Sequence, residues 1–247
     1  MNRGYQPDFI TLNPKVRDPG IRRQKAEKIR WALETYAGRS LDNALCLDIG
    51  CSSGLMTAQL ADLFQYMLGL DYDSVALGAI REHERQSVRF LRGDAMRLPL
   101  PDGAIELVIC AQIYEHVPSD NVLFKEIYRV LAPRGVVFFS GPNWLFPIEP
   151  HYYLPFLHWL PKSLAARYVQ LAGLDNHYYE QLRTYWHLRR LTAGFEVQVI
   201  THHILSDFIV RKHPNLRRLL HAIPDWIWML LEPLTPNFNW ILRKPDS

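Results

Sequence analysis

The sequence predicts an α/β fold in which a mostly parallel β-sheet carries helices on both faces. From residue 44 onward, short apolar runs alternate with helical stretches, an order typical of parallel sheets. The apolar runs are nearly continuous, which indicates strands buried on both sides. The length of 247 residues, with 48% hydrophobic and 21% charged residues, fits one domain with an elaboration.

The N-terminal segment is basic, because residues 1–40 contain nine Lys or Arg and four Asp or Glu. Asp18 and Pro19 have the residue types of a helix N-cap and of a first helical position. Apolar residues follow at helical spacing, and Gly38 ends the pattern. We therefore expect an amphipathic helix between Asp18 and Gly38, with a basic outer face.

The alternating core follows this helix. We expect strands over the apolar runs 44–49, 66–70, 88–92, 105–111 and 136–140. We expect helices over 54–64, 74–85 and 119–131, the last with Ser119 as its cap.

The alternation of strands and helices ends after the fifth predicted strand. The stretch from Trp144 to His187 contains eleven aromatic residues, and it predicts a cap or insertion of short helices over 143–193. Residue types typical of strands recur at 195–200 and 238–242, where we expect the last two strands. A hydrophobic helix is expected over 215–231, kinked or split at Pro224.

Composition limits the classes of function and location. A net charge of +3 is too weak to indicate nucleic-acid binding. The three cysteines, Cys46, Cys51 and Cys110, lie in apolar stretches and indicate reduced thiols in the cytoplasm. Neither a signal peptide nor an uninterrupted apolar run of membrane-spanning length is expected.

Two segments offer a peripheral membrane surface as an alternative to a purely cytoplasmic protein. These are the basic helix and the apolar segment 215–234. Interfacial residue types accompany them, namely Trp226, Trp228 and Trp240 with Arg217, Arg218 and Arg243. The competing interpretation is a solvated helix face and an ordinary core helix over the sheet.

The loop after the first strand carries the central motif, which runs from Asp48 through Gly50 to Gly54. Its glycines allow a tight turn and the close approach of a ligand to the backbone. A dinucleotide-binding loop fits poorly, because Ser52 stands where that pattern needs glycine. The segment also spells G-x-S-x-G, the nucleophile elbow of α/β-hydrolases, with Ser52 as nucleophile. That elbow follows several strands, whereas this loop follows the first.

Residues further along the chain decide between these interpretations. Asp71 ends the second strand, about where a carboxylate accepts hydrogen bonds from ribose hydroxyls. The third strand leads into Gly93-Asp94-Ala95, and the fourth ends in Tyr114-Glu115-His116. This ordered series resembles the class I S-adenosylmethionine-dependent methyltransferases, of the type found in quinone biosynthesis and small-molecule methylation. The resemblance covers roughly residues 40–142.

The resemblance implies a Rossmann-like, seven-stranded sheet with a final antiparallel hairpin, and S-adenosylmethionine as cofactor. It implies that Asp48 lies near the methionine amino group. Gly50, Cys51 and Ser52 would form the backbone around the methionine moiety, and Gly54 would complete the turn. The sequence departs from the family at Ser52, where glycine is usual.

The resemblance also implies the rest of the cofactor site. Asp71 would bind the ribose and Tyr72 would pack on the adenine. The remaining contacts would be Asp94 and Ala95 at the adenine edge, and Ala111 and Gln112 on the methionine side. The expected organisation is one domain over 1–247, with the basic helix region at 1–40, the cofactor-binding core at 41–142, the aromatic insertion at 143–193 and the closing segment at 194–247.

The acceptor side carries fewer signals. His116 follows the fourth strand and is a candidate general base, against the alternative of a packing histidine. Tyr114, His151 and Tyr152 are candidates for the acceptor pocket, and no metal site is expected from the histidine spacing. A small-molecule or lipid-like acceptor is expected. A non-catalytic binding module and a nicotinamide-dependent dehydrogenase are the alternative functions, and the sequence leaves the oligomeric state open.

Overall fold

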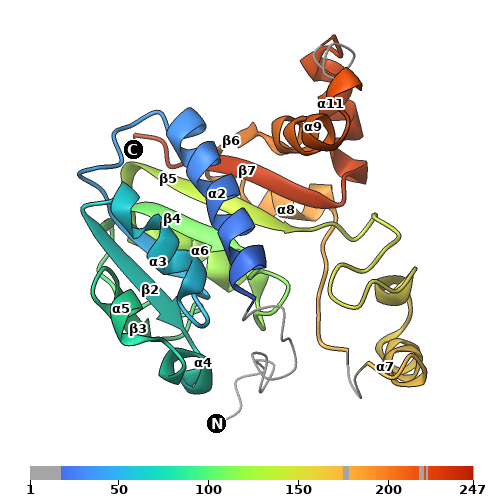
Figure 1. The fold of residues 1–247 in the computed structure, drawn as a ribbon, viewed down its shortest axis with the longest axis horizontal. Coiled ribbons are helices and arrows are strands. Elements are labelled where there is room, and N and C mark those ends of the chain that lie inside the picture. The colour runs from blue at the N-terminus through green and yellow to red at the C-terminus, as the bar shows by residue number, and fades with distance from the viewer. Residues whose placement is uncertain (1–17, 175–177, 217–219, 221, 247) are drawn as a thin grey trace.

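The computed structural model of the chain describes residues 18–174, 178–216, 220 and 222–246. Its centre is a seven-stranded sheet in the order β3-β2-β1-β4-β5-β7-β6 (Figure 1). Strand β7 is antiparallel to both neighbours. The predicted mostly parallel sheet with a final antiparallel hairpin is therefore confirmed. The strands are β1 (Leu45–Ile49), β2 (Tyr66–Asp71), β3 (Arg89–Arg92), β4 (Ile105–Ala111), β5 (Leu131–Pro142), β6 (Glu196–Val199) and β7 (Asn237–Arg243).

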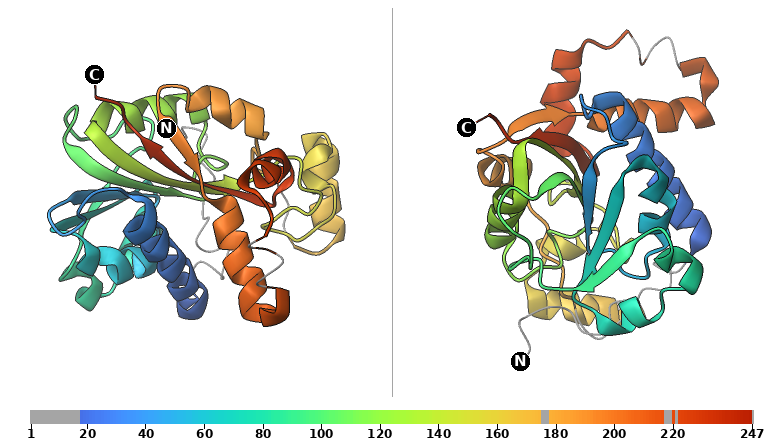
Figure 2. Two further views of the ribbon diagram at one scale, coloured as in Figure 1. Left: turned by 90° about the horizontal axis from the view of Figure 1, so that it is seen from above. Right: turned by 90° about the vertical axis from the view of Figure 1, so that its left-hand side faces the viewer.

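The two faces of the sheet carry two separate hydrophobic clusters, because side chains alternate along each strand. One face of β4 places Leu107 and Ile109 against helices α2 (Pro19–Tyr36) and α3 (Leu55–Leu60). The other places Val108 and Cys110 against α6 (Asp120–Val130) and α8 (Tyr185–Leu191). The sheet therefore lies between two helical layers (Figure 2).

Helix α2 begins as its sequence predicts, since the Asp18 carboxylate accepts a hydrogen bond from the Ile21 N–H at 3.0 Å. The predicted basic outer face is wrong in part. Arg22, Lys25 and Lys28 are partly buried, and Lys28 Nζ donates to Asn239 Oδ1 at 3.2 Å. The reason is spacing, because these cations lie on the same side of the helix as the buried apolar residues.

The helices at the β2–β3 edge are shorter than predicted. The stretch 54–64 forms α3 followed by the 3₁₀ turn η2 (Ala61–Leu63), and 74–85 splits into α4 (Ser74–Gly78) and α5 (Glu82–Arg85). The split has a local cause, because Glu84 Oε2 accepts from the Arg81 N–H at 2.7 Å and caps a new helix. Helix α6 matches its prediction, and Ser119 Oγ accepts from the Val122 N–H at 3.4 Å.

The aromatic segment predicted as an insertion contains η3 (Leu157–Trp159) and α7 (Lys162–Leu171). It has a small core of its own, made by Leu157, Ala165, Val169 and Tyr178. The segment leaves and rejoins the main body at one place, because Asn143 and Arg183 pair in an isolated parallel bridge.

The C-terminal part differs from its prediction in two ways. A helix that was not predicted, α9 (Thr201–Lys212), follows β6. The segment 215–231, expected as a helix kinked or split at Pro224, is divided at that proline, and its first part is not one long helix. Instead, η4 (Pro214–Leu216) is followed, after positions 217–219 and 221 outside the described residues, by α11 (Asp225–Leu231) and η5 (Glu232–Leu234). Pro224 is the N-cap of α11, as expected for a residue that cannot donate within a helix.

The residues proposed for a membrane surface divide between core and exterior. Trp240 is fully buried and donates to Glu232 Oε1 at 2.8 Å, so its assignment to an interface is wrong. Trp226 is 59% exposed, while Arg217 and Arg218 lie outside the described residues. Within the described part of the chain, no helix is both long and apolar enough to cross a lipid bilayer.

Candidate functional site

A cavity of about 300 Å³ opens where β1, β2 and β4 end. Carboxyl ends of parallel strands are the usual ligand-binding edge of such sheets. Nine of the residues predicted for the site line this cavity, namely Gly50, Ser52, Asp71, Tyr72, Ala95, Ala111, Gln112, His116 and His151.

The turn after β1 has the tight geometry that its glycines predict. Gly50 has φ of +75°, and a Cβ placed there would lie 2.0 Å from Ile113 Cδ1. Gly54 has φ of +72° and begins α3, with Phe90 against it. Ser52 also has a positive φ, +51°, a conformation that glycine adopts more easily than serine does. The positive φ at residue 52 therefore explains why glycine is usual at this position.

Asp48 lies just behind the cavity wall, with 1% of its surface exposed. Its Oδ2 accepts from Thr57 Oγ1 at 2.6 Å, whereas Oδ1 is buried without a hydrogen-bond partner. Burial raises the pKa of this carboxyl to about 7, against the opposing effects of Thr57 and Arg22. Such an oxygen is placed to accept from a buried ligand donor.

Asp71 joins the loops after β1 and β2. Its Oδ2 accepts from the Ser52 N–H at 2.7 Å, and its Oδ1 accepts from the Asp73 N–H at 2.8 Å. Burial raises its pKa, although these hydrogen bonds oppose the shift. Asp71 lines the cavity together with Tyr72, at the position predicted for a ribose contact.

Two further predicted cofactor residues, Cys51 and Asp94, lie behind the lining. Cys51 is buried, and burial raises the pKa of its thiol. Asp94 forms a turn, in which its Oδ1 accepts from the Met96 N–H at 2.8 Å. Its neighbours Gly93 and Ala95 line the cavity. The cysteine and the aspartate therefore shape the wall that their neighbours present.

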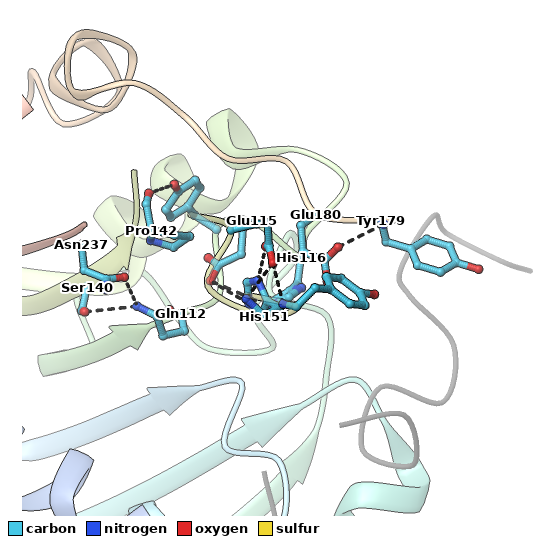
Figure 3. Close-up of polar contacts among 12 residues, drawn as sticks. Gln112, Glu115, His116, Ser140, Pro142, His151, Tyr179, Glu180 and Asn237 are labelled. Carbon is cyan, nitrogen blue, oxygen red and sulfur yellow. Dashed lines mark hydrogen bonds and ion pairs between the residues drawn. The ribbon is translucent and has the colours of Figure 1, made fainter. Parts of the chain in front are cut away.

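The end of β4 lines the cavity with Ala111 and Gln112, the two residues predicted for the methionine side. Gln112 has φ of +62°, and its Nε2 lies 3.4 Å from both Ser140 Oγ and Asn237 Oδ1 (Figure 3). These contacts fix the amide beside Ala111 in the wall.

Tyr114, predicted for the acceptor pocket, lies in the core instead. It is 1% exposed and packs on Phe139 with ring centroids 5.9 Å apart. Its hydroxyl donates to the Pro142 carbonyl and accepts from the Arg183 N–H at 3.2 Å. Tyr152 lies outside the lining as well and packs against Tyr178.

Three titratable side chains meet at one end of the cavity, as Figure 3 shows. Glu115 Oε1 lies 3.8 Å from His116 Nε2 and 4.0 Å from His151 Nε2. Burial raises the pKa of Glu115 to about 7 and holds the pKa of His116 well below its ordinary value. Burial also opposes charge on His151, but the hydrogen bond and charge of Glu149 raise its pKa on balance.

Sequence reasoning missed several lining residues that come from α2 and from the aromatic segment. Ile21, Arg22 and Lys25 of α2 line the cavity, as do Pro150 and Tyr153 of the aromatic segment. Burial lowers the pKa of Lys25 to about 8. The usable signal was the spacing of cations on the apolar face of α2, because a cation on a buried face marks a polar cavity or a partner.

Comparison with known proteins gives a match to the family described as a methyltransferase domain, over residues 47–139. A probable S-adenosylmethionine-dependent methyltransferase of Mycolicibacterium smegmatis is 35% identical over 98 residues, 39% of this chain and 37% of the relative. A ubiquinone biosynthesis O-methyltransferase of Methylococcus capsulatus is 28% identical over 56% of this chain and 66% of the relative. The chain thus spans less than two thirds of either relative.

Solved structures share the fold at low identity. A putative sarcosine dimethylglycine methyltransferase from Galdieria sulphuraria superposes with a TM-score of 0.57 at 18% identity, covering 92% of this chain and 88% of that one. A Haemonchus contortus phosphoethanolamine N-methyltransferase 2 gives 0.56 at 20% identity, covering 88% and 52%. The match over residues 47–139, with the strand order and the glycine turn, supports a class I S-adenosylmethionine-dependent methyltransferase.

Proposed function

We propose that this protein transfers a methyl group from S-adenosylmethionine to a small-molecule or lipid-like acceptor by in-line displacement. The observation that carries the proposal is the cavity at the strand ends, where the positive-φ turn at Gly50 meets Asp71. The cofactor supplies an already activated methyl group on its sulfonium. The protein therefore needs mainly to align the two reactants and to exclude water.

The residues of this chain fit the cofactor. The unpartnered Asp48 Oδ1 suits the methionine amino group, which would neutralise a buried carboxylate. The close approach at Gly50 leaves no room for a side chain and lets the turn with Cys51, Ser52 and Gly54 surround the methionine moiety. The remaining assignments are the ribose to Asp71, the adenine face to Tyr72, the adenine edge to Asp94 and Ala95, and the methionine side to Ala111 and Gln112.

The acceptor end proposed here comprises His116 and His151 together with Pro150, Tyr153 and Lys25, all of which line the cavity. Aromatic and proline side chains favour an acceptor with an apolar or planar part. The relative from Methylococcus capsulatus is named for O-methylation in ubiquinone biosynthesis, which supports an oxygen acceptor on such a molecule. His116 stays a predicted general base, and burial, which lowers its pKa, keeps the imidazole in the neutral form that a base requires.

The test is calorimetric titration of the full chain with S-adenosylmethionine and, separately, with a nicotinamide dinucleotide. We expect binding of the first alone, and Asp71→Asn should weaken it. Asp102→Asn is the matched control, because Asp102 pairs with Arg129 away from the cavity. Failure to bind S-adenosylmethionine would remove the proposal, and dinucleotide binding would favour the dehydrogenase.

A screen for products separates catalysis from binding. The protein is incubated with methyl-labelled S-adenosylmethionine and an extract of lipids and small molecules, and labelled products are found by mass spectrometry. A labelled acceptor that disappears with the Asp71→Asn variant is the expected result. Cofactor binding without any labelled product would favour the non-catalytic binding module.

A further inference from the structure

We propose that Glu115, His116 and His151 bind one divalent transition-metal ion at the acceptor end of the cavity. Two histidine nitrogens and one carboxylate are a donor set that such ions accept readily, with further positions left open. The histidine spacing in the sequence predicted no metal site. Folding creates one by bringing the end of β4 next to the aromatic segment (Figure 3).

The distances fit ligands of one ion better than hydrogen-bond partners. The 3.8 and 4.0 Å separations between Glu115 Oε1 and the two histidine Nε2 atoms exceed hydrogen-bond length. One ligand atom from each of the three residues lies within 4.8 Å of the others. Two bonds of about 2.1 Å to one metal place their ligand atoms about 3.0 to 3.4 Å apart. Side-chain movements of less than about 1 Å therefore complete the site.

The carboxylate of Glu115 is buried without a hydrogen-bond partner. The residue is 1% exposed, and neither carboxylate oxygen has a hydrogen-bond partner. A buried carboxylate without such partners is costly unless it is paired or bound to a metal. The backbone at Glu115 is held in place, because its carbonyl accepts from the Gln181 N–H at 3.0 Å. The carboxylate is thus positioned at the cavity without a hydrogen bond of its own.

His151 is oriented as metal-binding histidines usually are. Its Nδ1 lies 2.7 Å from Glu149 Oε1, and Glu149 is fully buried. Glu149 Oε2 in turn accepts from the backbone N–H groups of His151 and Tyr152, each at 2.7 Å. A proton on Nδ1, donated to Glu149, leaves the lone pair of Nε2 facing Glu115. A carboxylate behind a histidine ligand fixes its tautomer and ring direction in this way.

The position gives the ion a part in the proposed reaction, and this step rests on the proposed function. Both histidines line the cavity, so an ion held by them would be accessible to the acceptor. Binding to the ion acidifies an acceptor hydroxyl, whose proton passes to water. The oxygen then forms the new O–CH₃ bond as the S–CH₃ bond breaks and S-adenosylhomocysteine leaves. In this arrangement His116 is a ligand and does not act as a base.

Metal binding is tested on tag-free protein of residues 1–247, stripped with a chelator and titrated with Zn²⁺, Mn²⁺ and Mg²⁺ by calorimetry. We expect about one transition-metal ion per chain, with Mg²⁺ bound more weakly. Glu115→Gln and His151→Ala should abolish binding, and Glu149→Gln should weaken it about 10- to 100-fold. His187→Ala is the matched control, because His187 pairs with Asp120 outside the cavity.

Two further readouts keep the proposal falsifiable if a variant folds poorly. Zn²⁺ should raise the thermal midpoint of the wild type and of His187→Ala, but not that of His151→Ala. Co²⁺ should give visible absorption bands that are lost in Glu115→Gln. A folded wild-type protein that binds no ion, or equal binding by wild type and His151→Ala, overturns the site. Methyl transfer that survives complete chelation overturns its part in the reaction and returns His116 to the role of base.

The result is separable from that of the proposed function. Metal binding is measured without S-adenosylmethionine, and cofactor binding is measured on the stripped protein. An ion without the cofactor would leave the metal site standing and refute the methyl-transfer proposal. Binding of the cofactor without binding of an ion would refute the metal site and leave the methyl-transfer proposal standing.

Discussion

The replacement Gly50→Ala tests whether the β1 turn is as tight as the structure indicates. Alanine at φ of +75° costs about 1–2 kcal/mol, as left-handed backbone does for residues with a Cβ. The new methyl would also lie 2.0 Å from Ile113 Cδ1, an overlap that costs about 1–3 kcal/mol in a packed site. We therefore expect the free energy of unfolding to fall by about 2–5 kcal/mol.

Two comparison variants separate these contributions. Gly103 has φ of +65°, and a Cβ placed there would have no neighbour within 4 Å, so Gly103→Ala measures the backbone cost alone. Ile113→Val removes the Cδ1 atom that the new methyl would meet. The double variant Gly50→Ala/Ile113→Val should therefore be more stable than the sum of the single changes predicts, by about 1–3 kcal/mol.

The assay is equilibrium unfolding in urea, followed by circular dichroism, together with calorimetric titration of S-adenosylmethionine. Affinity for the cofactor should fall with Gly50→Ala and recover in part with the double variant, because Ile113 lines the cavity. The reasoning is refuted if Gly50→Ala costs no more than Gly103→Ala, or if the two changes at 50 and 113 are simply additive.

Three further outcomes are expected. Burial raises the pKa of Asp48 and of Glu232 to about 7. The free energy of unfolding of the ligand-free protein, measured in urea, should therefore fall as pH rises from about 4 through 7, by about 4 kcal/mol for Asp48. Asp48→Asn should flatten this dependence on pH. His116→Ala should cut turnover about 100-fold or more, whether the imidazole holds the proposed ion or acts as the base, while cofactor affinity stays unchanged. Trp226 and Leu230 are exposed on α11. Replacing both by Ser should preserve the fold and weaken sedimentation with anionic liposomes. If the wild type shows no salt-sensitive binding to these liposomes, the membrane hypothesis is refuted.

The features that the sequence predicted well are local along the chain. Strand positions follow from apolar runs, and the turn at Gly50 follows from glycine spacing. Asp71 was predictable too, because a carboxylate at the end of the second strand must lie beside the first turn. These inferences need only strand order and direction, which parallel sheets constrain strongly.

The features that were missed depend on packing between distant segments. The direction of Lys25 and the burial of Tyr114 are set by which side of each element meets its neighbours. The pairing of His151 with Glu149 is close in sequence, but its approach to Glu115 depends on how the aromatic segment folds back. Trp240 looked interfacial, yet a central antiparallel strand buries both of its faces.

The bridge between Asn143 and Arg183 bears on how such a protein diversifies. Because the aromatic segment departs and returns at one point, its length and composition can change without moving the strands on either side. Strands β1, β2 and β4, whose ends line the cavity, all precede Asn143 in the chain and lie outside the segment from Asn143 to Arg183. Under the proposed function, selection for a new acceptor acts on one exchangeable segment while the strands proposed to hold the methyl donor are inherited intact.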